Sequence, residues 1–319
     1  MGATDSRPGG VAWQRQAARR ARLAGAVQVW LADPQALPAS MLNPAPPLCT
    51  AERARAAALR FDADRQLYTA AHTLLRHLLS RYLPGAPAAW CFVANPHGRP
   101  DLHPAAALGG GALRHPLRFS LSHTAGLVAV AVGWGWDVGV DVEKLRPGLE
   151  VDAVSPALLS ALEQRWYGAL PAADREAAFL GLWTMKESLL KALGVGIGED
   201  LQQIALMPGW RSARAVLAGL PGLRKAGPGG MVLARLATGH ALAVSALGPL
   251  TRHRPAPLPT DTLPGAPAPR RVDIFDLRAD GGRRRPPLTC LPVIDIACAA
   301  PRVSTLETSD DRILDTACF

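Results

Sequence analysis

The sequence predicts an α+β fold made of two halves, each combining strands with one or two helices. Three observations lead to this prediction. Short apolar segments alternate as strands do, longer segments repeat apolar residues at helical spacing, and the two kinds do not alternate regularly. The strand–helix–strand order typical of a dinucleotide-binding fold is therefore not predicted. We expect a basic arm at 1–24, an N-terminal half at 25–132, a C-terminal half at 133–249 and a tail at 250–319.

Both ends of the chain are expected to be disordered. Residues 1–24 hold five Arg and a single Asp, which is typical of a solvated basic arm. Residues 250–319 contain ten Pro and few aromatic residues, so they offer little apolar surface to offset the entropy of ordering. The chain as a whole is 49% hydrophobic, which is sufficient for a substantial core between these ends.

The N-terminal half is predicted to contain one long helix between strands. Residues 50–83 form the helical segment, because five leucines repeat along one face. Ser122 to Gly126 are expected to form the turn between the last two strands. The predicted strands of this half are 27–31, 90–93, 117–121 and 127–132.

The C-terminal half is predicted to begin with a strand at 138–142 and to continue with two helices. The first helix is expected at 156–170, with Pro156 at its first position, and the second at 172–193, ended by Gly194. Further strands are expected at 201–206, 231–236 and 240–247.

Charge and cysteine content limit the class of protein. The net charge of +9 suits an acidic partner or a phosphate-rich ligand, but no nucleic-acid-binding module is recognisable. The five cysteines form no C-x-x-C pair and no zinc spacing, and their odd number favours a reducing compartment. No apolar run approaches the roughly 18 residues that span a bilayer, and no secretory signal is evident. We therefore expect a cytoplasmic protein that binds neither membrane nor nucleic acid.

Two carboxylates stand at alternate positions of one predicted strand. Asp141 and Glu143 should point to the same face, with Val142 facing the core. Hard oxygen ligands with open positions suit Mg²⁺, which binds one or two carboxylates together with substrate phosphates. The simpler alternative is two acids that end a strand at the surface.

A third acid and a polar dipeptide extend this candidate site. Glu187 and Lys191 share one helix face, as either a functional pair or an ordinary surface ion pair. Ser122 and His123 could orient a phosphate, or they could form a solvated turn. A hydrolase is not favoured, since the sequence has no G-x-S-x-G elbow, and no Walker A motif is present either.

Four segments in fixed order together resemble the 4'-phosphopantetheinyl transferase superfamily, in its larger, pseudo-dimeric class. The resemblance covers about residues 26–248. The segments are His97-Gly98-Arg99-Pro100, Phe119-Ser120-Leu121-Ser122-His123, Gly139-Val140-Asp141-Val142-Glu143 and Trp183-Thr184-Met185-Lys186-Glu187-Ser188 with Lys191.

The resemblance implies two similar α+β halves, related by a pseudo-twofold axis, with coenzyme A in the cleft between them. It implies Mg²⁺ on the pyrophosphate and lysines that stabilise the transition state. The matching metal ligands are Asp141, Glu143 and Glu187. The matching coenzyme A contacts are Arg53, Arg99, Ser122 and His123, and the matching catalytic residues are Glu187, Lys191 and Lys186. In the first helix, relatives often carry an arginine where this chain has Leu67, so Arg65 or another neighbour would clamp the 3'-phosphate.

The implied activity is transfer of the 4'-phosphopantetheine arm of coenzyme A to a serine of an apo acyl or peptidyl carrier protein, with release of 3',5'-ADP. The implied partners are coenzyme A and such a carrier protein, and the pseudo-dimeric class suggests a monomer. The alternative is a coenzyme A-binding protein on the same fold without catalysis. The presence of all three acids favours the enzyme.

Overall fold

The computed structural model describes residues 26–42, 45–103, 117–145, 148–196, 201–206, 216–217, 229–248, 271–277, 283–284, 288–290 and 294–296. The predicted arm at 1–24 lies outside these residues.

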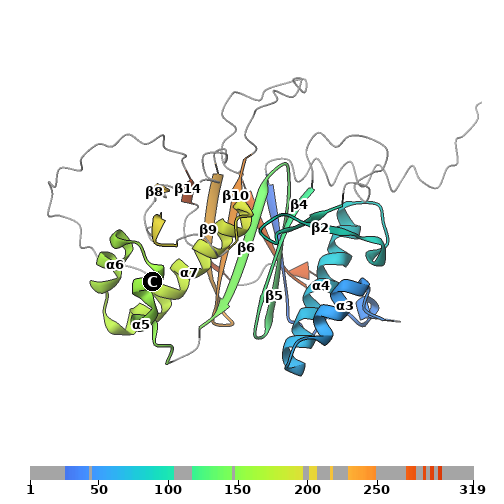
Figure 1. Ribbon diagram of the computed structural model, residues 1–319, viewed down its shortest axis with the longest axis horizontal. Coiled ribbons are helices and arrows are strands. Elements are labelled where there is room, and N and C mark those ends of the chain that lie inside the picture. The colour runs from blue at the N-terminus through green and yellow to red at the C-terminus, as the bar shows by residue number, and fades with distance from the viewer. Residues whose placement is uncertain are drawn as a thin grey trace, which may run out of the picture.

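Two antiparallel-rich sheets form the centre of the molecule and confirm the α+β class (Figure 1). The first sheet has the order β12-β11-β1-β5-β4 and the second β13-β9-β10-β6, with β14 also pairing with β9. The strands of the first sheet are β12 (Arg283–Arg284), β11 (Arg271–Leu277), β1 (Ala26–Ala32), β5 (Leu127–Trp134) and β4 (Leu117–Thr124). Those of the second are β13 (Leu288–Cys290), β9 (Gly229–Leu236), β10 (His240–Leu247), β6 (Asp137–Lys144) and β14 (Ile294–Ile296).

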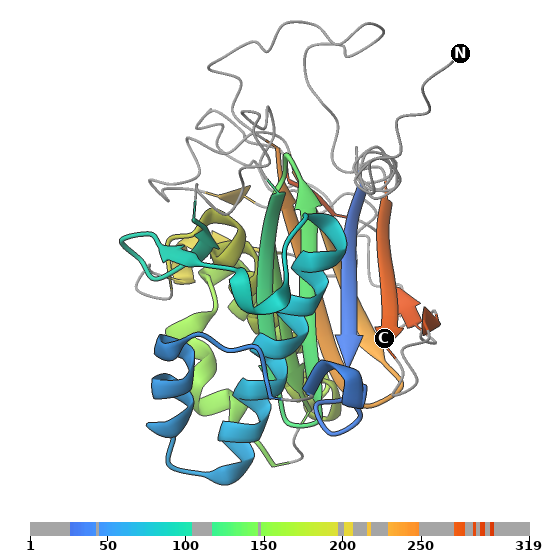
Figure 2. The ribbon, with the colours of Figure 1, turned by 90° about the vertical axis from the view of Figure 1, so that its right-hand side faces the viewer.

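The helices cover the outer faces of the two sheets (Figures 1 and 2). The N-terminal helices α2 (Ala39–Leu42), α3 (Thr50–Ala57) and α4 (Asp62–Tyr82) lie on the first sheet, and α5 (Val151–Leu158), α6 (Ala161–Gly168) and α7 (Ala172–Leu193) on the second. Short elements complete the described chain: η1 (Pro87–Ala89), β2 (Phe92–Ala94), β3 (Pro100–Leu102), η3 (Leu201–Gln203), β7 (Ile204–Ala205) and β8 (Val216–Leu217).

Alternating residues on the strands divide the core into three apolar layers. Even-numbered residues of β5, such as Val130, pack against α4. Ala129 and Ala131 face the second sheet, where they meet Val140 and Val244. The outer face of the second sheet packs against α7 in a third cluster. This arrangement explains why β5 is apolar throughout, since both of its faces are buried.

Two predicted helices are each broken in the structure. The segment predicted as one helix at 50–83 is divided into α3 and α4. Asp62 and Asp64 stand in the first turn of α4, where acidic side chains favour a new helix start. The predicted helix 156–170 is α5 and α6, because Ser160 and Glu163 form a capping box that begins α6. Pro156 consequently lies inside α5 rather than at its first position.

The segment 250–319, predicted to be mostly disordered, contributes four short strands to the two sheets. The longest is β11, which pairs in parallel with β1 (Figure 2). A single-sequence pattern does not reveal this pairing, because its partner strand lies more than 200 residues earlier in the chain. The remainder of this segment lies outside the described residues. Among the helices that the structure describes, none has the length and apolar character needed to cross a membrane.

Candidate active site

The site lies along the seam where the edge strand β4 of one sheet meets the edge strand β6 of the other. Two serines on the same face of β4 join the strands. Ser120 Oγ accepts from the Val140 N–H at 3.0 Å and Ser122 Oγ from the Val142 N–H at 3.3 Å. These hydroxyls satisfy β6 backbone donors that would otherwise be buried and unpaired. The strand bearing the two acids is thereby fixed against the N-terminal half.

The position of Ser122 and His123 differs from the prediction of a turn. β4 continues to Thr124, paired with β5 along its whole length, and both residues belong to it. The turn consists of Ala125 and Gly126, whose φ of 81° favours glycine. Strand geometry therefore places Ser122 toward β6, while His123 points to the opposite side of the strand.

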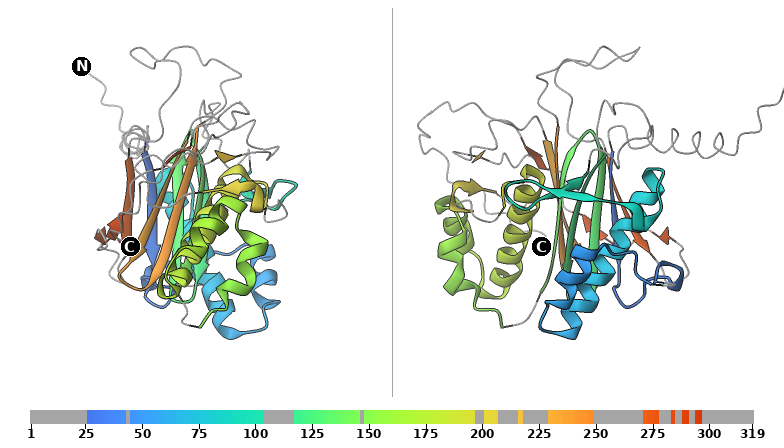
Figure 3. Two further views of the ribbon diagram at one scale, coloured as in Figure 1. Left: turned by 90° about the vertical axis from the view of Figure 1, so that its left-hand side faces the viewer. Right: turned by 45° about the vertical axis from the view of Figure 1, so that its right-hand side comes forward.

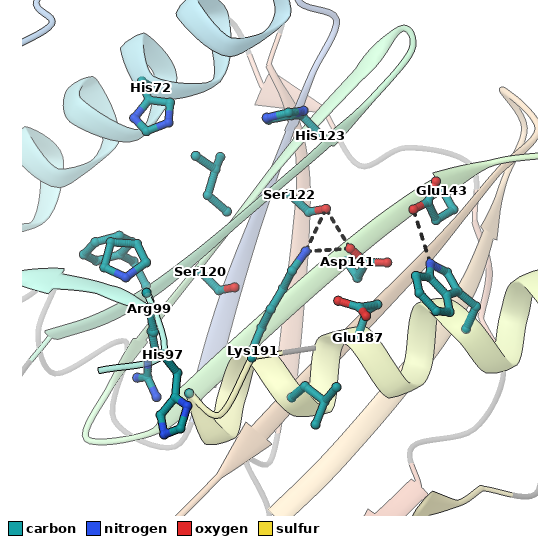
Figure 4. Close-up of a pocket in the computed structure, with 18 residues that line it drawn as sticks. His72, His97, Arg99, Ser120, Ser122, His123, Asp141, Glu143, Glu187 and Lys191 are labelled. Carbon is teal, nitrogen blue, oxygen red and sulfur yellow. Dashed lines mark hydrogen bonds and ion pairs between the residues drawn. The ribbon is translucent and has the colours of Figure 1, made fainter. Parts of the chain in front are cut away.

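Helix α7 brings the third acid to β6 by unusually close packing at Gly139. A Cβ atom at this position would lie 1.8 Å from the backbone oxygen of Ser188, so only glycine allows the helix to approach this closely. Glu187 and Lys191, one helical turn apart, consequently lie over Asp141 (Figure 4).

Asp141 is the centre of the polar contacts in the pocket. Its Oδ1 accepts from Lys191 Nζ at 2.6 Å and from Ser122 Oγ at 2.8 Å. Lys191 Nζ also lies 3.1 Å from Ser122 Oγ, which closes a triangle (Figure 4). Glu143 Oε1 accepts from Trp183 Nε1 at 3.4 Å. The three acids, Asp141, Glu143 and Glu187, and Lys191 line one cavity of about 530 Å³.

Two buried carboxylate oxygens in this cavity have no hydrogen-bond partner within the described chain: Asp141 Oδ2 and Glu187 Oε1. Burial raises the pKa of Glu187 to about 7, and the negative charge of Asp141 adds to this effect. Lys191 opposes the rise in pKa, and Glu143 adds to it weakly. The pocket thus contains more negative charge than its own lysine neutralises.

The donor set fits a divalent cation such as Mg²⁺. Within the described residues, the side chains as they stand bring no three His, Cys, Asp or Glu groups together closely enough to hold a metal ion. The two unpaired oxygens are nevertheless hard donors in a buried site, and Glu143 lines the same cavity. A cation would satisfy both oxygens and relieve the repulsion among the acids.

Arg99 belongs to the wall of the cavity and ties the two halves together. Its Nη1 donates to the Ala192 carbonyl at 2.8 Å, near the C-terminus of α7, and its Nη2 donates to Asp137 at 3.0 Å. Asn95 Nδ2 donates to the Gly194 carbonyl at 2.7 Å. The β2–β3 hairpin therefore reaches across the seam to the end of α7 (Figure 3).

Comparison with known proteins decides the family. A sequence profile described as the 4'-phosphopantetheinyl transferase superfamily matches residues 137–226, which include the three acids and Lys191. The chain is 33% identical over 162 residues to the 4'-phosphopantetheinyl transferase HetI of Nostoc sp., a match covering 50% of this chain and 66% of the relative. The chain belongs to the 4'-phosphopantetheinyl transferase superfamily.

Other superfamily members match over a similar extent. A putative 4'-phosphopantetheinyl transferase of Synechocystis sp. is 27% identical, over 49% of this chain and 61% of the relative. The transferase psf-1 of Bacillus pumilus is 29% identical, over 47% and 59%. Each of these three matches spans less than two thirds of the relative's own length. The solved holo-(acyl-carrier-protein) synthase of Bacillus anthracis, in complex with CoA, superposes at a TM-score of 0.30 with 19% identity, over 35% of this chain and 96% of that one.

Two residues assigned by the resemblance to this superfamily lie away from the cavity. Lys186 points to the opposite side of α7, where its buried Nζ donates to Glu163 at 2.6 Å and to the carbonyls of Leu158 and Leu201, both at 2.8 Å. Its predicted catalytic role is not supported by this position, since all three of its N–H donors are engaged elsewhere. Arg53 donates to the Leu48 carbonyl and is not among the residues that line the cavity.

Three pocket residues of this superfamily member received no role from the sequence. Ser120 lies two positions before Ser122 on β4, and the period of two could have identified it. Trp183 stands one helical turn before Glu187 and contacts Glu143. His72 on α4 lines the cavity, but nothing in its local pattern distinguishes it from an ordinary helical residue.

Proposed function

We propose that this protein transfers the 4'-phosphopantetheine group of coenzyme A to a serine hydroxyl of an apo acyl or peptidyl carrier protein, in a Mg²⁺-dependent reaction that releases 3',5'-ADP. The observation that carries the proposal is the convergence of Asp141, Glu143 and Glu187 with Lys191 in the seam between the halves. Superfamily membership supports the same activity.

In this reaction the serine oxygen of the carrier attacks the β-phosphorus of coenzyme A, and the bond from that phosphorus to the bridging oxygen breaks. Glu187 accepts the serine proton, directly or through one water, because its carboxylate lines the cavity beside Asp141 and Lys191. Lys191 stabilises the negative charge that develops on the phosphoryl oxygens.

Asp141, Glu143 and Glu187 would hold the Mg²⁺, since two of them offer unpaired buried oxygens to the pocket. Bound there, Mg²⁺ would neutralise the charge of the diphosphate and favour attack at phosphorus. Ser122 would keep Asp141 oriented through its 2.8 Å hydrogen bond.

Binding of coenzyme A is assigned to the other walls of the cavity. Arg99 and His123 line it and could contact phosphate groups. Arg53 would need its side chain released from the Leu48 carbonyl to take part. The carrier protein would approach the basic surface of α3 and α4, with electrostatic steering of its acidic helix. We further propose that the protein acts as a monomer in the cytoplasm.

The proposal is tested by intact-protein mass spectrometry of an apo carrier protein incubated with this protein, coenzyme A and Mg²⁺. We expect the carrier to gain one phosphopantetheine mass. The gain should disappear with a chelator and with Glu187→Gln, whereas Glu150→Gln, an exposed acid outside the cavity, should leave it intact.

Coenzyme A binding without any mass gain, across carriers of fatty-acid, polyketide and nonribosomal-peptide systems, would contradict the proposal. That outcome would favour a coenzyme A-binding protein without catalysis.

A further inference from the structure

The cavity has a second polar end, away from the carboxylates, formed by two imidazoles. His72 on α4 and His123 on β4 both line it (Figure 4). Burial is the main cause that lowers the pKa of His123, and the positive charges of His72 and Lys191 lower it further. The two imidazole rings are therefore close enough to influence each other electrostatically. One end of the pocket therefore presents acids that need a cation, and the other end presents imidazoles that can receive an anion directly.

The ring of His72 has a fixed orientation because an ionised carboxylate lies behind it. His72 Nδ1 lies 2.9 Å from Glu52 Oε1. Burial raises the pKa of Glu52, but hydrogen bonds from His72, the Cys49 N–H and Arg76 outweigh it, so that this pKa falls to about 2. An ionised Glu52 can only accept, so Nδ1 carries the proton that it donates. Nε2 makes no hydrogen bond within the described chain and belongs to a ring that lines the cavity.

The carboxylate behind His72 is itself firmly held. Arg76 Nε donates to Glu52 Oε2 at 2.9 Å, and Arg76 Nη1 donates to the carbonyls of Pro87 at 3.0 Å and Trp90 at 2.9 Å. The Arg76 side chain is completely buried. Tyr68 stacks on the His72 ring with centroids 4.1 Å apart. A side chain ordered this strongly before ligand binding loses little entropy when it binds.

We propose that His72 is a binding residue for the phosphomonoester of coenzyme A, acting with His123, and that Glu52 is its positioning residue. This inference rests on the proposed function and deepens it, because coenzyme A carries both a diphosphate and a separate phosphomonoester. The imidazole end would take the phosphomonoester, and the acidic end, with its cation, the diphosphate.

The contact between His72 and phosphate uses the second ring nitrogen. With Nδ1–H donated to Glu52, a proton on Nε2 makes the ring an imidazolium, which offers a phosphate oxygen both an N–H donor and a positive charge. The charged or titratable groups that face His72 are Glu52 on α3, Tyr68 and Arg76 on α4, and His123 on β4.

Calorimetric titration with two ligands tests the assignment. Coenzyme A and dephospho-coenzyme A differ only in the 3'-phosphate, and both keep the diphosphate. At pH 6.5 with Mg²⁺, we expect His72→Gln to weaken coenzyme A binding about tenfold, as for loss of one charged hydrogen bond. Binding of dephospho-coenzyme A should be unchanged.

Two further variants serve as matched controls. His77→Gln, on the same helix but with its ring against the Met41 carbonyl, should bind coenzyme A like the wild type. His72→Arg should restore most of the affinity, because guanidinium carries a permanent positive charge and donates hydrogen bonds to phosphate. Should the variants fold poorly, the imidazole nitrogen resonances of the wild-type protein give a second test. The His72 Nε2 signal should shift with coenzyme A and not with dephospho-coenzyme A.

Equal losses for both ligands, or an unshifted His72 resonance at saturating coenzyme A, would overturn the inference. If the wild-type protein modifies a carrier but His72→Gln binds coenzyme A normally, only this inference fails. If the wild-type protein binds no coenzyme A, the proposed function fails and takes this inference with it.

Discussion

Glu187 lies where burial and two neighbouring carboxylates oppose its negative charge. Its side chain is 5% exposed, and its pKa is raised from 4.5 to about 7, first by burial and then by Asp141. In the absence of a cation, the native protein binds the proton of Glu187 more tightly than the unfolded chain does. Deprotonation of this residue therefore destabilises the fold, and a divalent cation should reverse the effect.

A stability measurement on Glu187→Gln tests this electrostatic account. Below pH 4.5 the carboxyl is protonated in both states, so the substitution should change little. Between pH 4.5 and 7 the wild type should lose stability relative to the variant. At pH 8 in chelator the variant should be more stable by up to about 3 kcal/mol, because each unit of pKa shift is worth about 1.4 kcal/mol. Urea denaturation at several pH values measures the difference, with Glu150→Gln as the control.

Addition of Mg²⁺ distinguishes a metal ligand from a merely buried acid. The wild type should gain stability from Mg²⁺ at pH 8, and Glu187→Gln should gain less. A variant that is no more stable than the wild type at pH 8 in chelator would show that Glu187 is not electrostatically opposed in the native state.

At the scale of the elements, helix α7 has different roles on its two sides. One side carries Glu187 and Lys191 into the seam, and the other carries Lys186 into a buried pair with Glu163. Glu163 also accepts from the Ser160 and Leu206 N–H groups at 2.7 and 2.8 Å. The pair thus joins α7 to α6 and to the segment that follows α7. This attachment fixes which side of α7 faces β6.

Unfolding of a Lys186→Met variant tests this structural role. The substitution leaves Glu163 buried without its cation, so we expect a loss of about 3–5 kcal/mol in the free energy of unfolding. The double variant Lys186→Met/Glu163→Gln removes both charges and should recover part of that loss. A Lys186→Met protein with wild-type stability and no transferase activity would instead restore the catalytic assignment of Lys186.

Local sequence signals explain which element boundaries were predicted well. The bounds of α7 agree with the prediction, because Pro171 precedes the helix and Gly194, with a φ of 71°, ends it. The strand β1 was also predicted within one residue at each end. The predicted turn after β4 begins too early, because Ser122 is a polar strand residue whose hydrogen-bond partners lie on β6 and α7 rather than in solvent.

At the scale of the whole molecule, the site exists only where the two halves meet. Ser122 and His123 come from the N-terminal half, and the acids and Lys191 from the C-terminal half. Arg99 and Asn95 carry hydrogen bonds between the halves at the edge of the same cavity. Separation of the halves would remove the site, so the cavity should be sensitive to changes far from its acids.

The basic surface of α3 and the loop after it should influence the carrier protein and not coenzyme A. Arg55 and Arg60 are exposed there and do not line the cavity of the acids. We expect charge reversal of both to glutamate to raise the KM for the carrier about tenfold, with the affinity for coenzyme A unchanged, because long-range attraction mainly accelerates encounter. Steady-state kinetics with each substrate varied gives the two values.

The exposed Arg235 on β9 offers the matched control for this reversal. Its change to glutamate alters the net charge without altering the α3 surface. Equal effects of the α3 reversal on carrier and coenzyme A, or an equal effect of Arg235→Glu on the carrier, would contradict docking at this surface.

The sequence by itself determined the α+β class and, through the resemblance of four motifs in fixed order, the superfamily, and it predicted the acids of the candidate site. The shared faces of these residues follow from local spacing: Asp141 and Glu143 share a strand face, and Glu187 and Lys191 share a helix face, wherever those elements pack. The tertiary structure alone decided which of the two α7 lysines faces the seam. It also paired His72 with Glu52 across 20 residues and placed Ser122 against Asp141. Such choices depend on which face of each element is buried against which neighbour, and no single segment of the chain contains that information.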